Sequence, residues 1–145
     1  MKRLTLSIFL FFAMFFSMAG SSGSKFGKGI TFTNGTLAQA IIKAKAQKKL
    51  IFIDISAVWC PPCQMLKLKT FPNKKVGDFF NANFISLSFD GERGAGLKLA
   101  RDYQITAYPT LIILDSEGKA IIGTMGYMDA DDLIAFGKAA IEKSK

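Results

Sequence analysis

The chain has 145 residues, half of them hydrophobic, and a formal net charge of +8 at pH 7. This length is typical of one domain with a single packed core. The absence of histidine excludes Ser-His-Asp and Cys-His nucleophilic sites, and two cysteines alone cannot supply the usual four ligands of zinc, so we expect no metal site.

A signal peptide is predicted over residues 1–19. Lys2 and Arg3 form a basic start, and the apolar run Leu4–Met18 follows them. Ser17 and Ala19 are small residues at positions −3 and −1 of a cleavage site after Ala19. The apolar run is shorter than the roughly 20 residues of a membrane-spanning helix, which favours cleavage over the alternative, a retained membrane anchor. We therefore expect a periplasmic or secreted protein that meets the membrane only during targeting.

A flexible lead-in is predicted over residues 20–29, because this segment holds four glycines and three serines. Residues 30–145 are predicted to form one domain, since neither an internal repeat nor a second boundary is visible in the sequence. The segment Ile30–Thr33, at the beginning of this domain, predicts a short first strand.

Helical and strand patterns alternate through the domain. Thr36 is expected to cap a helix that runs to about Gln47, and the apolar run at 50–55 is typical of a central strand covered on both faces. The remaining predicted elements are a helix over 60–71, further helical turns over 75–81, a strand over 84–89, a helix over 94–103, a hairpin of strands 110–114 and 120–123, and a helix capped by Asp129. Helices between the early strands predict parallel pairing, and the hairpin is antiparallel. The expected fold is α/β with a mixed sheet.

Trp59-Cys60-Pro61-Pro62-Cys63 follows the buried strand and opens a helix. Cys60 is expected to be the exposed nucleophile, because the free N–H groups and the dipole of a helix start favour a thiolate. Cys63 lies one turn later and can attack a mixed disulfide to release the product. The alternative is a purely structural disulfide, which would give little stabilisation across so short a loop. Haem attachment would need histidine after the second cysteine, where Gln64 stands.

The two prolines bear on the direction of electron flow. Pro61 occupies the first helical position, where proline is favoured, but Pro62 removes a second N–H that could have held the Cys60 thiolate. Neither histidine nor lysine lies between the cysteines. A weakly stabilised thiolate leaves the disulfide comparatively stable, so we predict a reductase, with a disulfide oxidase or isomerase as the alternative.

Asp54 lies inside an otherwise apolar strand, six residues before the first cysteine. Burial would raise the pKa of this carboxyl group. A carboxylate with a raised pKa near the second thiol could accept the proton of Cys63 as it attacks. The alternative is an aspartate held by hydrogen bonds for structural reasons.

Ala107-Tyr108-Pro109-Thr110 leads into the first strand of the hairpin. A proline that opens a strand beside an active site is a candidate for a cis peptide bond, which would hold the extended backbone of Tyr108 against a substrate. A trans proline at a strand start is the alternative from this segment alone.

These motifs resemble the thioredoxin family. The resemblance covers nearly all of residues 36–143 and depends on the cysteine motif, on Asp54, on the Tyr-Pro-Thr segment, and on Gly126 after the hairpin. A closer likeness is to the C-terminal thioredoxin-like domain of the thiol:disulfide interchange protein DsbD and its small exported relatives, carried by residues 70–73 and 126–130.

The resemblance implies a thioredoxin fold, with a parallel βαβ half, an antiparallel ββα half and helices on both faces of the sheet. It implies that Cys60 is the nucleophile, that Cys63 is the resolving thiol and that the two form the redox disulfide. Trp59, Tyr108 and a cis Pro109 are the expected substrate-binding residues. No cofactor is expected. The implied partners are disulfide-containing proteins and an upstream thiol electron donor.

Two departures from thioredoxin itself are visible. In thioredoxin, a lysine in the strand after the redox helix pairs with the buried aspartate. The corresponding strand at 84–89 lacks this lysine, so the pKa of Asp54 is expected to be set by burial alone. Leu68 stands where thioredoxin has a helix-kinking proline.

A binding module without turnover is the alternative outside the enzyme class. Basic chains can bind nucleic acid, but the predicted export and the scattered lysines argue against that partner.

Overall fold

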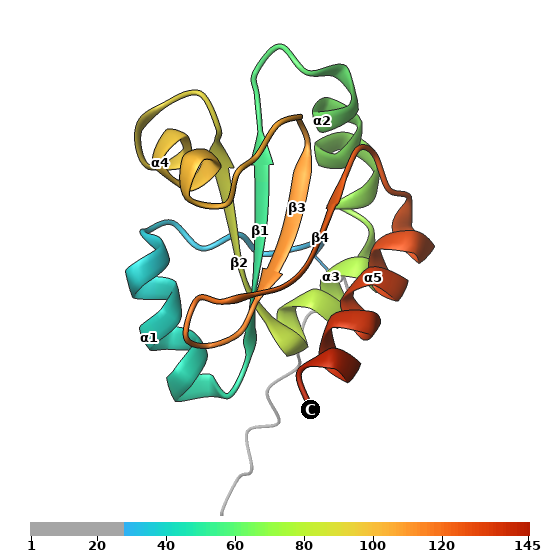
Figure 1. Ribbon diagram of the computed structural model, residues 1–145. Helices are drawn as coiled ribbons and strands as arrows, with labels where there is room; N and C mark the ends of the chain where they lie inside the picture. Colours follow the sequence, from blue (N-terminus) through green and yellow to red (C-terminus); the bar gives the residue numbers. More distant parts are fainter. Residues whose placement is uncertain (1–27) are drawn as a thin grey trace, which may run out of the picture.

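A four-stranded mixed sheet forms the centre of the computed structural model, which describes residues 28–145 (Figure 1). The strands are β1 (Leu50–Ser56), β2 (Phe84–Asp90), β3 (Thr110–Leu114) and β4 (Ala120–Met125). Their order across the sheet is β2-β1-β3-β4. β1 pairs with β2 in parallel and with β3 in antiparallel, and β3 and β4 form an antiparallel hairpin. This arrangement confirms the predicted mixed sheet.

The predicted first strand at Ile30–Thr33 is wrong. Phe32 makes only an isolated parallel bridge with Ser86. The reason lies in the neighbouring N–H groups, because Thr33 donates to the Ser86 carbonyl while Ile30 donates to the carbonyl of Phe71, each at 2.8 Å. The segment therefore leaves the sheet edge after one bridge. The predicted signal peptide and most of the lead-in lie outside the described residues.

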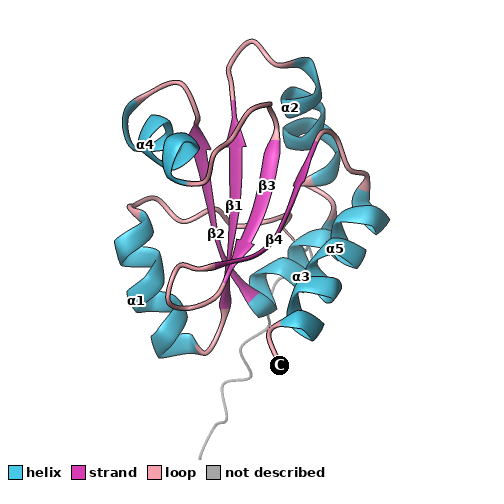
Figure 2. Cartoon of the chain, in the orientation of Figure 1, coloured by secondary structure: helices cyan, strands magenta, loops and turns pink. Residues whose placement is uncertain are grey.

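Helices cover both faces of the sheet (Figure 2). They are α1 (Leu37–Gln47), α2 (Pro61–Met65), a π-helical turn η1 (Leu66–Thr70), α3 (Lys74–Asn83), α4 (Gly94–Asp102) and α5 (Ala130–Lys143). Both predicted caps are present: the side chain of Thr36 accepts the N–H of Gln39, and that of Asp129 accepts the N–H of Asp132. None of the helices in residues 28–145 is long and apolar enough to cross a membrane.

Alternation along β1 divides the core into two layers. Ile51, Ile53 and Ile55 pack with α1 and α4 on one face of the sheet. Phe52 packs on the other face with η1, α3 and α5. Asp54 has the same parity as Phe52, so the strand directs this carboxyl group toward the face that carries the cysteine helix.

The cysteine helix changes its hydrogen-bond pattern midway. The N–H of Leu66 donates to the carbonyls of Cys63 and Pro62, but the N–H of Phe71 reaches five residues back to the carbonyl of Leu66, at 2.8 Å. That longer bond is the mark of a π-helical turn. The segment with Leu68 in place of proline therefore remains helical as predicted, with one widened turn.

Candidate functional site

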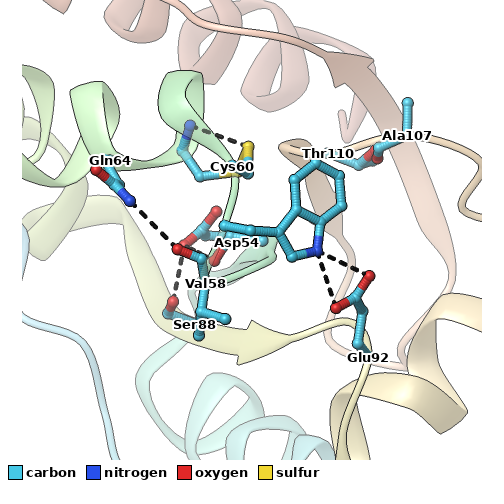
Figure 3. The surroundings of a disulfide bond; sticks show 11 residues. Asp54, Val58, Cys60, Gln64, Ser88, Glu92, Ala107 and Thr110 are labelled. Atoms are coloured by element: carbon cyan, nitrogen blue, oxygen red, sulfur yellow. Dashed lines mark hydrogen bonds between the residues drawn. A yellow bond between two sulfur atoms is a disulfide. The ribbon is translucent and has the colours of Figure 1, made fainter.

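The cysteine pair lies at the N-terminus of α2, immediately after β1 (Figure 3). Cys60 and Cys63 form a disulfide, with their Cα atoms 5.3 Å apart. Cys60 is the N-cap residue, and its Sγ accepts the N–H of Cys63 at 3.2 Å. Pro61 and Pro62 occupy the first two helical positions, so neither supplies an N–H to this sulfur. The predicted cap geometry is confirmed.

The expectation of an exposed Cys60 is wrong for this disulfide form. Both cysteine residues are only 1% exposed, and they pack against Ala57 and the ring of Tyr108. The exposed side chains are instead Val58 and Trp59, which precede the pair and are 62% and 63% accessible. The loop before the helix therefore presents an apolar surface beside a covered disulfide.

Asp54 is fully buried beneath this surface. Its Oδ2 accepts the hydroxyl of Ser88 at 2.7 Å and, more distantly, that of Ser56 at 3.5 Å. Its Oδ1 has no hydrogen-bond partner among the described residues. In the view of Figure 3, the carboxyl group lies between Ser88 and Cys60.

Burial raises the pKa of Asp54 above its ordinary value of 3.8, as predicted. The hydrogen bond from Ser88, the positive charge of Lys67 and the bond from Ser56 each act in the opposite direction. The expectation that burial alone tunes this group is therefore wrong. Ser88 occupies the register position opposite Asp54 in β2, and Lys67 comes from the widened turn of the cysteine helix.

The Tyr108–Pro109 peptide bond is cis, as predicted. Pro109 is buried, whereas Tyr108 is half-buried and reaches the disulfide. The hydroxyl of Thr110 donates to the carbonyl of Ala107 at 2.7 Å and closes the turn. The ring of Tyr108 also needs Gly91, because a Cβ at that position would lie 2.4 Å from the ring.

Glu92 is a site residue that the sequence did not reveal. Both of its carboxylate oxygens accept the indole N–H of Trp59, at 3.1 and 3.0 Å. Trp59 also meets Tyr108 edge to face, with ring centroids 6.3 Å apart. Trp59 and Glu92 are separated by 33 residues, so only the parallel register of β1 and β2 brings them together. In the described part of the chain, no three side chains of the metal-ligating types gather in one cluster.

Comparison with known proteins identifies the family. Residues 37–141 match the family model described as a thioredoxin-like domain. The chain belongs to the thioredoxin-like family. The predicted family and fold are thereby confirmed, and the Cys60–Cys63 pair places the chain among the thiol–disulfide oxidoreductases of that family.

Individual relatives agree with this assignment. The chain is 28% identical over 103 residues to the thiol:disulfide interchange protein DsbD of Pseudoalteromonas atlantica, an alignment that covers 69% of this chain and 17% of that protein. It is 30% identical over 97 residues to thioredoxin H4 of Arabidopsis thaliana, covering 67% and 75% of the two chains. The chain thus spans about a sixth of the length of the DsbD protein that it matches.

Solved structures show the same fold. A candidate disulphide-isomerase from Bacteroides thetaiotaomicron is 34% identical with a TM-score of 0.70, covering 80% of this chain and 96% of that chain. The oxidised C-terminal domain of DsbD from Neisseria meningitidis has a TM-score of 0.61 at 19% identity, covering 71% and 90%. The second likeness establishes the shared fold alone.

Proposed function

We propose that this protein is an exported reductase of protein disulfides that works through the Cys60/Cys63 dithiol. The observation that carries the proposal is the cysteine pair at the start of a helix, where Cys60 Sγ accepts the N–H of Cys63. That bond remains available to a thiolate when the disulfide opens. Pro61 and Pro62 leave Cys60 with few other donors, which favours a stable disulfide and hence the reducing direction.

The reaction has two exchange steps. The Cys60 thiolate attacks a substrate disulfide, so that a Cys60–substrate bond forms while the substrate S–S bond breaks and a first thiolate leaves. Cys63 then gives its proton to Asp54 and attacks Cys60, which re-forms the internal disulfide and releases the second substrate thiolate. The substrate gains two electrons and the protein dithiol loses two. An upstream thiol donor must return them.

The substrate would dock on the apolar surface beside the disulfide. Val58 and Trp59 are well exposed there, and Tyr108 packs against the cysteine pair. The cis bond before Pro109 sets the backbone of Tyr108 next to this surface, where it could pair with an extended substrate segment. Export is supported by the pattern of residues 1–19 and by the likeness to DsbD.

Insulin reduction with dithiothreitol as the donor tests the activity. The wild-type protein should accelerate precipitation of the insulin B chain, and Cys60→Ser should abolish the acceleration. Redox equilibration against glutathione tests the direction: a potential of roughly −200 mV or below supports a reductase, whereas a value near −120 mV would make the protein an oxidase. Trapping with Cys63→Ser should retain substrates as mixed disulfides on Cys60.

Disulfide isomerisation is the second candidate function. It is favoured by the 34% identity to the candidate disulphide-isomerase from Bacteroides thetaiotaomicron. Refolding of scrambled ribonuclease separates the two functions, because an isomerase restores ribonuclease activity with Cys60 alone, whereas a reductase needs both cysteines.

A further inference from the structure

A hydroxyl group connects the buried carboxylate to solvent. Ser88 is solvent-exposed, yet its hydroxyl donates to Oδ2 of the fully buried Asp54 at 2.7 Å. Ser88 also lines a crevice of about 440 Å³, together with Gly29, Ile30, Phe32, Lys67 and Phe71. One side chain therefore touches both the buried acid and an open crevice.

We propose that Ser88 is a positioning residue that relays protons between Asp54 and solvent. This inference rests on the proposed role of Asp54 as the proton acceptor for Cys63. The two carboxylate oxygens of Asp54 differ in their hydrogen bonds. Oδ2 accepts the hydroxyl of Ser88, whereas Oδ1 has no partner within residues 28–145 and is free to accept a proton. Without an exit, a proton delivered to a buried carboxylate would stay there and would return to the Cys63 sulfur in the reverse exchange, which slows net resolution within a single turnover.

The relay begins at the thiol of Cys63. The thiol proton of Cys63 passes to Oδ1 of Asp54 as the Cys63–Cys60 bond forms and the substrate thiolate leaves. A half-turn of the carboxyl group exchanges its oxygens and presents the acidic proton to Oγ of Ser88. Ser88 accepts that proton while its own hydroxyl proton leaves to a water molecule or a buffer base that enters the crevice. The net result is one proton moved from Cys63 to solvent.

A second hydroxyl near Asp54, that of Ser56, does not reach solvent, which leaves Ser88 as the relay residue. Ser56 also donates to Oδ2 of Asp54, but at 3.5 Å, and it is only 2% exposed. It can therefore stabilise the carboxylate without leading to solvent. Lys67 is the charged group that acts on Asp54, and it contributes through its field because it forms no hydrogen bond to the carboxylate among those present in the described residues.

Single-turnover resolution of the mixed disulfide measures the relay. Reduced protein is mixed with oxidised glutathione, quenched with acid, and the glutathionylated Cys60 species is followed by mass. Ser88→Ala should slow resolution by about tenfold, less than the roughly 100- to 10,000-fold lost with a positioned acid–base group itself. Ser88→Thr, which keeps the hydroxyl, should resolve at close to the wild-type rate. The matched control Ser56→Ala should change the rate by less than about twofold.

Chemical rescue distinguishes a relay from a structural contact. Imidazole is small enough to enter the crevice, and its free base should restore the rate of Ser88→Ala in proportion to its concentration while leaving the wild-type rate unchanged. Lys67→Gln should shift the pH profile of resolution upward without making it depend on imidazole. Equal slowing by Ser88→Ala and Ser56→Ala, or the absence of rescue, would overturn the relay.

The test also separates the relay from the proposed function. If Asp54→Asn slows resolution and Ser88→Ala does not, the relay is wrong while Asp54 keeps its role. If neither variant slows resolution and Cys63 is still required, both the relay and the role of Asp54 are wrong, but the dithiol reaction stands.

Discussion

At Asp54, burial and hydrogen bonding act on one carboxyl group in opposite directions. Burial dominates and raises the pKa, while Ser88, Lys67 and Ser56 limit the rise. A carboxylate with a raised pKa is a stronger base toward a thiol than an exposed aspartate would be. The same burial costs stability once the group is ionised, because a charge removed from water is only partly compensated by two hydroxyls.

Asp54→Asn should slow resolution of the mixed disulfide by about 100-fold and the initial attack much less, since only resolution needs the base. The variant should also be more stable at pH 7 by about 1–3 kcal/mol, because a neutral amide replaces a buried carboxylate. The folded-state pKa lies above the unfolded value, so this gain should be full above the folded pKa and should vanish as the pH falls toward 3.8.

Urea unfolding of the oxidised protein at several pH values measures the effect of Asp54→Asn on stability. Asp78→Asn is the control, since Asp78 is exposed in an ion pair with Lys74. A pH-independent difference between wild type and Asp54→Asn would contradict the linkage, and equal slowing of both exchange steps would indicate a packing role.

Trp59 depends on a side chain distant in sequence. Glu92→Ala removes the acceptor of the indole N–H, so the ring should lose its fixed orientation against Tyr108. We expect the KM for a protein substrate to rise about fivefold, the equivalent of one exposed hydrogen bond of about 1 kcal/mol, with kcat nearly unchanged. Because Trp59 is the only tryptophan, its emission spectrum reports directly whether the ring has lost its contact with Glu92.

The control is Glu117→Ala, outside the site. An unchanged KM with an altered spectrum would exclude Trp59 from substrate binding.

At the scale of elements, the start of α2 limits how well a thiolate is held. The N-cap sulfur of Cys60 receives the N–H of Cys63 at the third helical position, and Pro62 removes the donor at the second. The widened turn η1 then carries Lys67, whose positive charge lowers the pKa of Asp54 and so opposes the effect of burial. One helix therefore carries both the proposed nucleophile and part of the electrostatic environment of the proposed base.

Pro62→Ala restores an N–H that can donate to the Cys60 thiolate. The reduced form should gain about 0.5–1.5 kcal/mol, so the reduction potential should rise by about 10–30 mV. Pro61→Ala is the matched control, because the first helical N–H does not take part in the cap bond and the potential should barely change. Equilibration of each variant against glutathione measures the shift. Equal shifts in both variants would show that helix flexibility, not the donor, sets the potential.

The whole molecule is a helix-covered sheet whose C-terminal strand ends and neighbouring loops gather the site. β1 leads directly into the cysteine helix, the loop after β2 supplies Gly91 and Glu92, and the turn before β3 supplies Tyr108 and its cis bond. These segments are joined by the register of the sheet and not by proximity in sequence.

Export is the prediction that belongs to the chain as a whole. If residues 1–19 are a signal peptide, mature protein recovered from its host should begin near Gly20. Intact-mass spectrometry of the extracytoplasmic fraction checks this, with Ala19→Arg as the variant expected to block cleavage. Full-length protein found in the membrane with residues 1–19 retained would contradict cleavage.

The features that could be predicted from the sequence are mainly those that depend on local interactions. Helix caps at Thr36 and Asp129, the apolar runs of the central strands and the cysteine motif involve residues close together in the chain, and the cis bond at Pro109 was implied by the family resemblance. The covering of Cys60 by Tyr108 and the hydrogen bond of Asp54 to Ser88 could be seen only in the folded protein. Each of these two contacts joins residues more than 30 positions apart, and strand register and helix packing, which fix them, leave no short-range signal in the sequence.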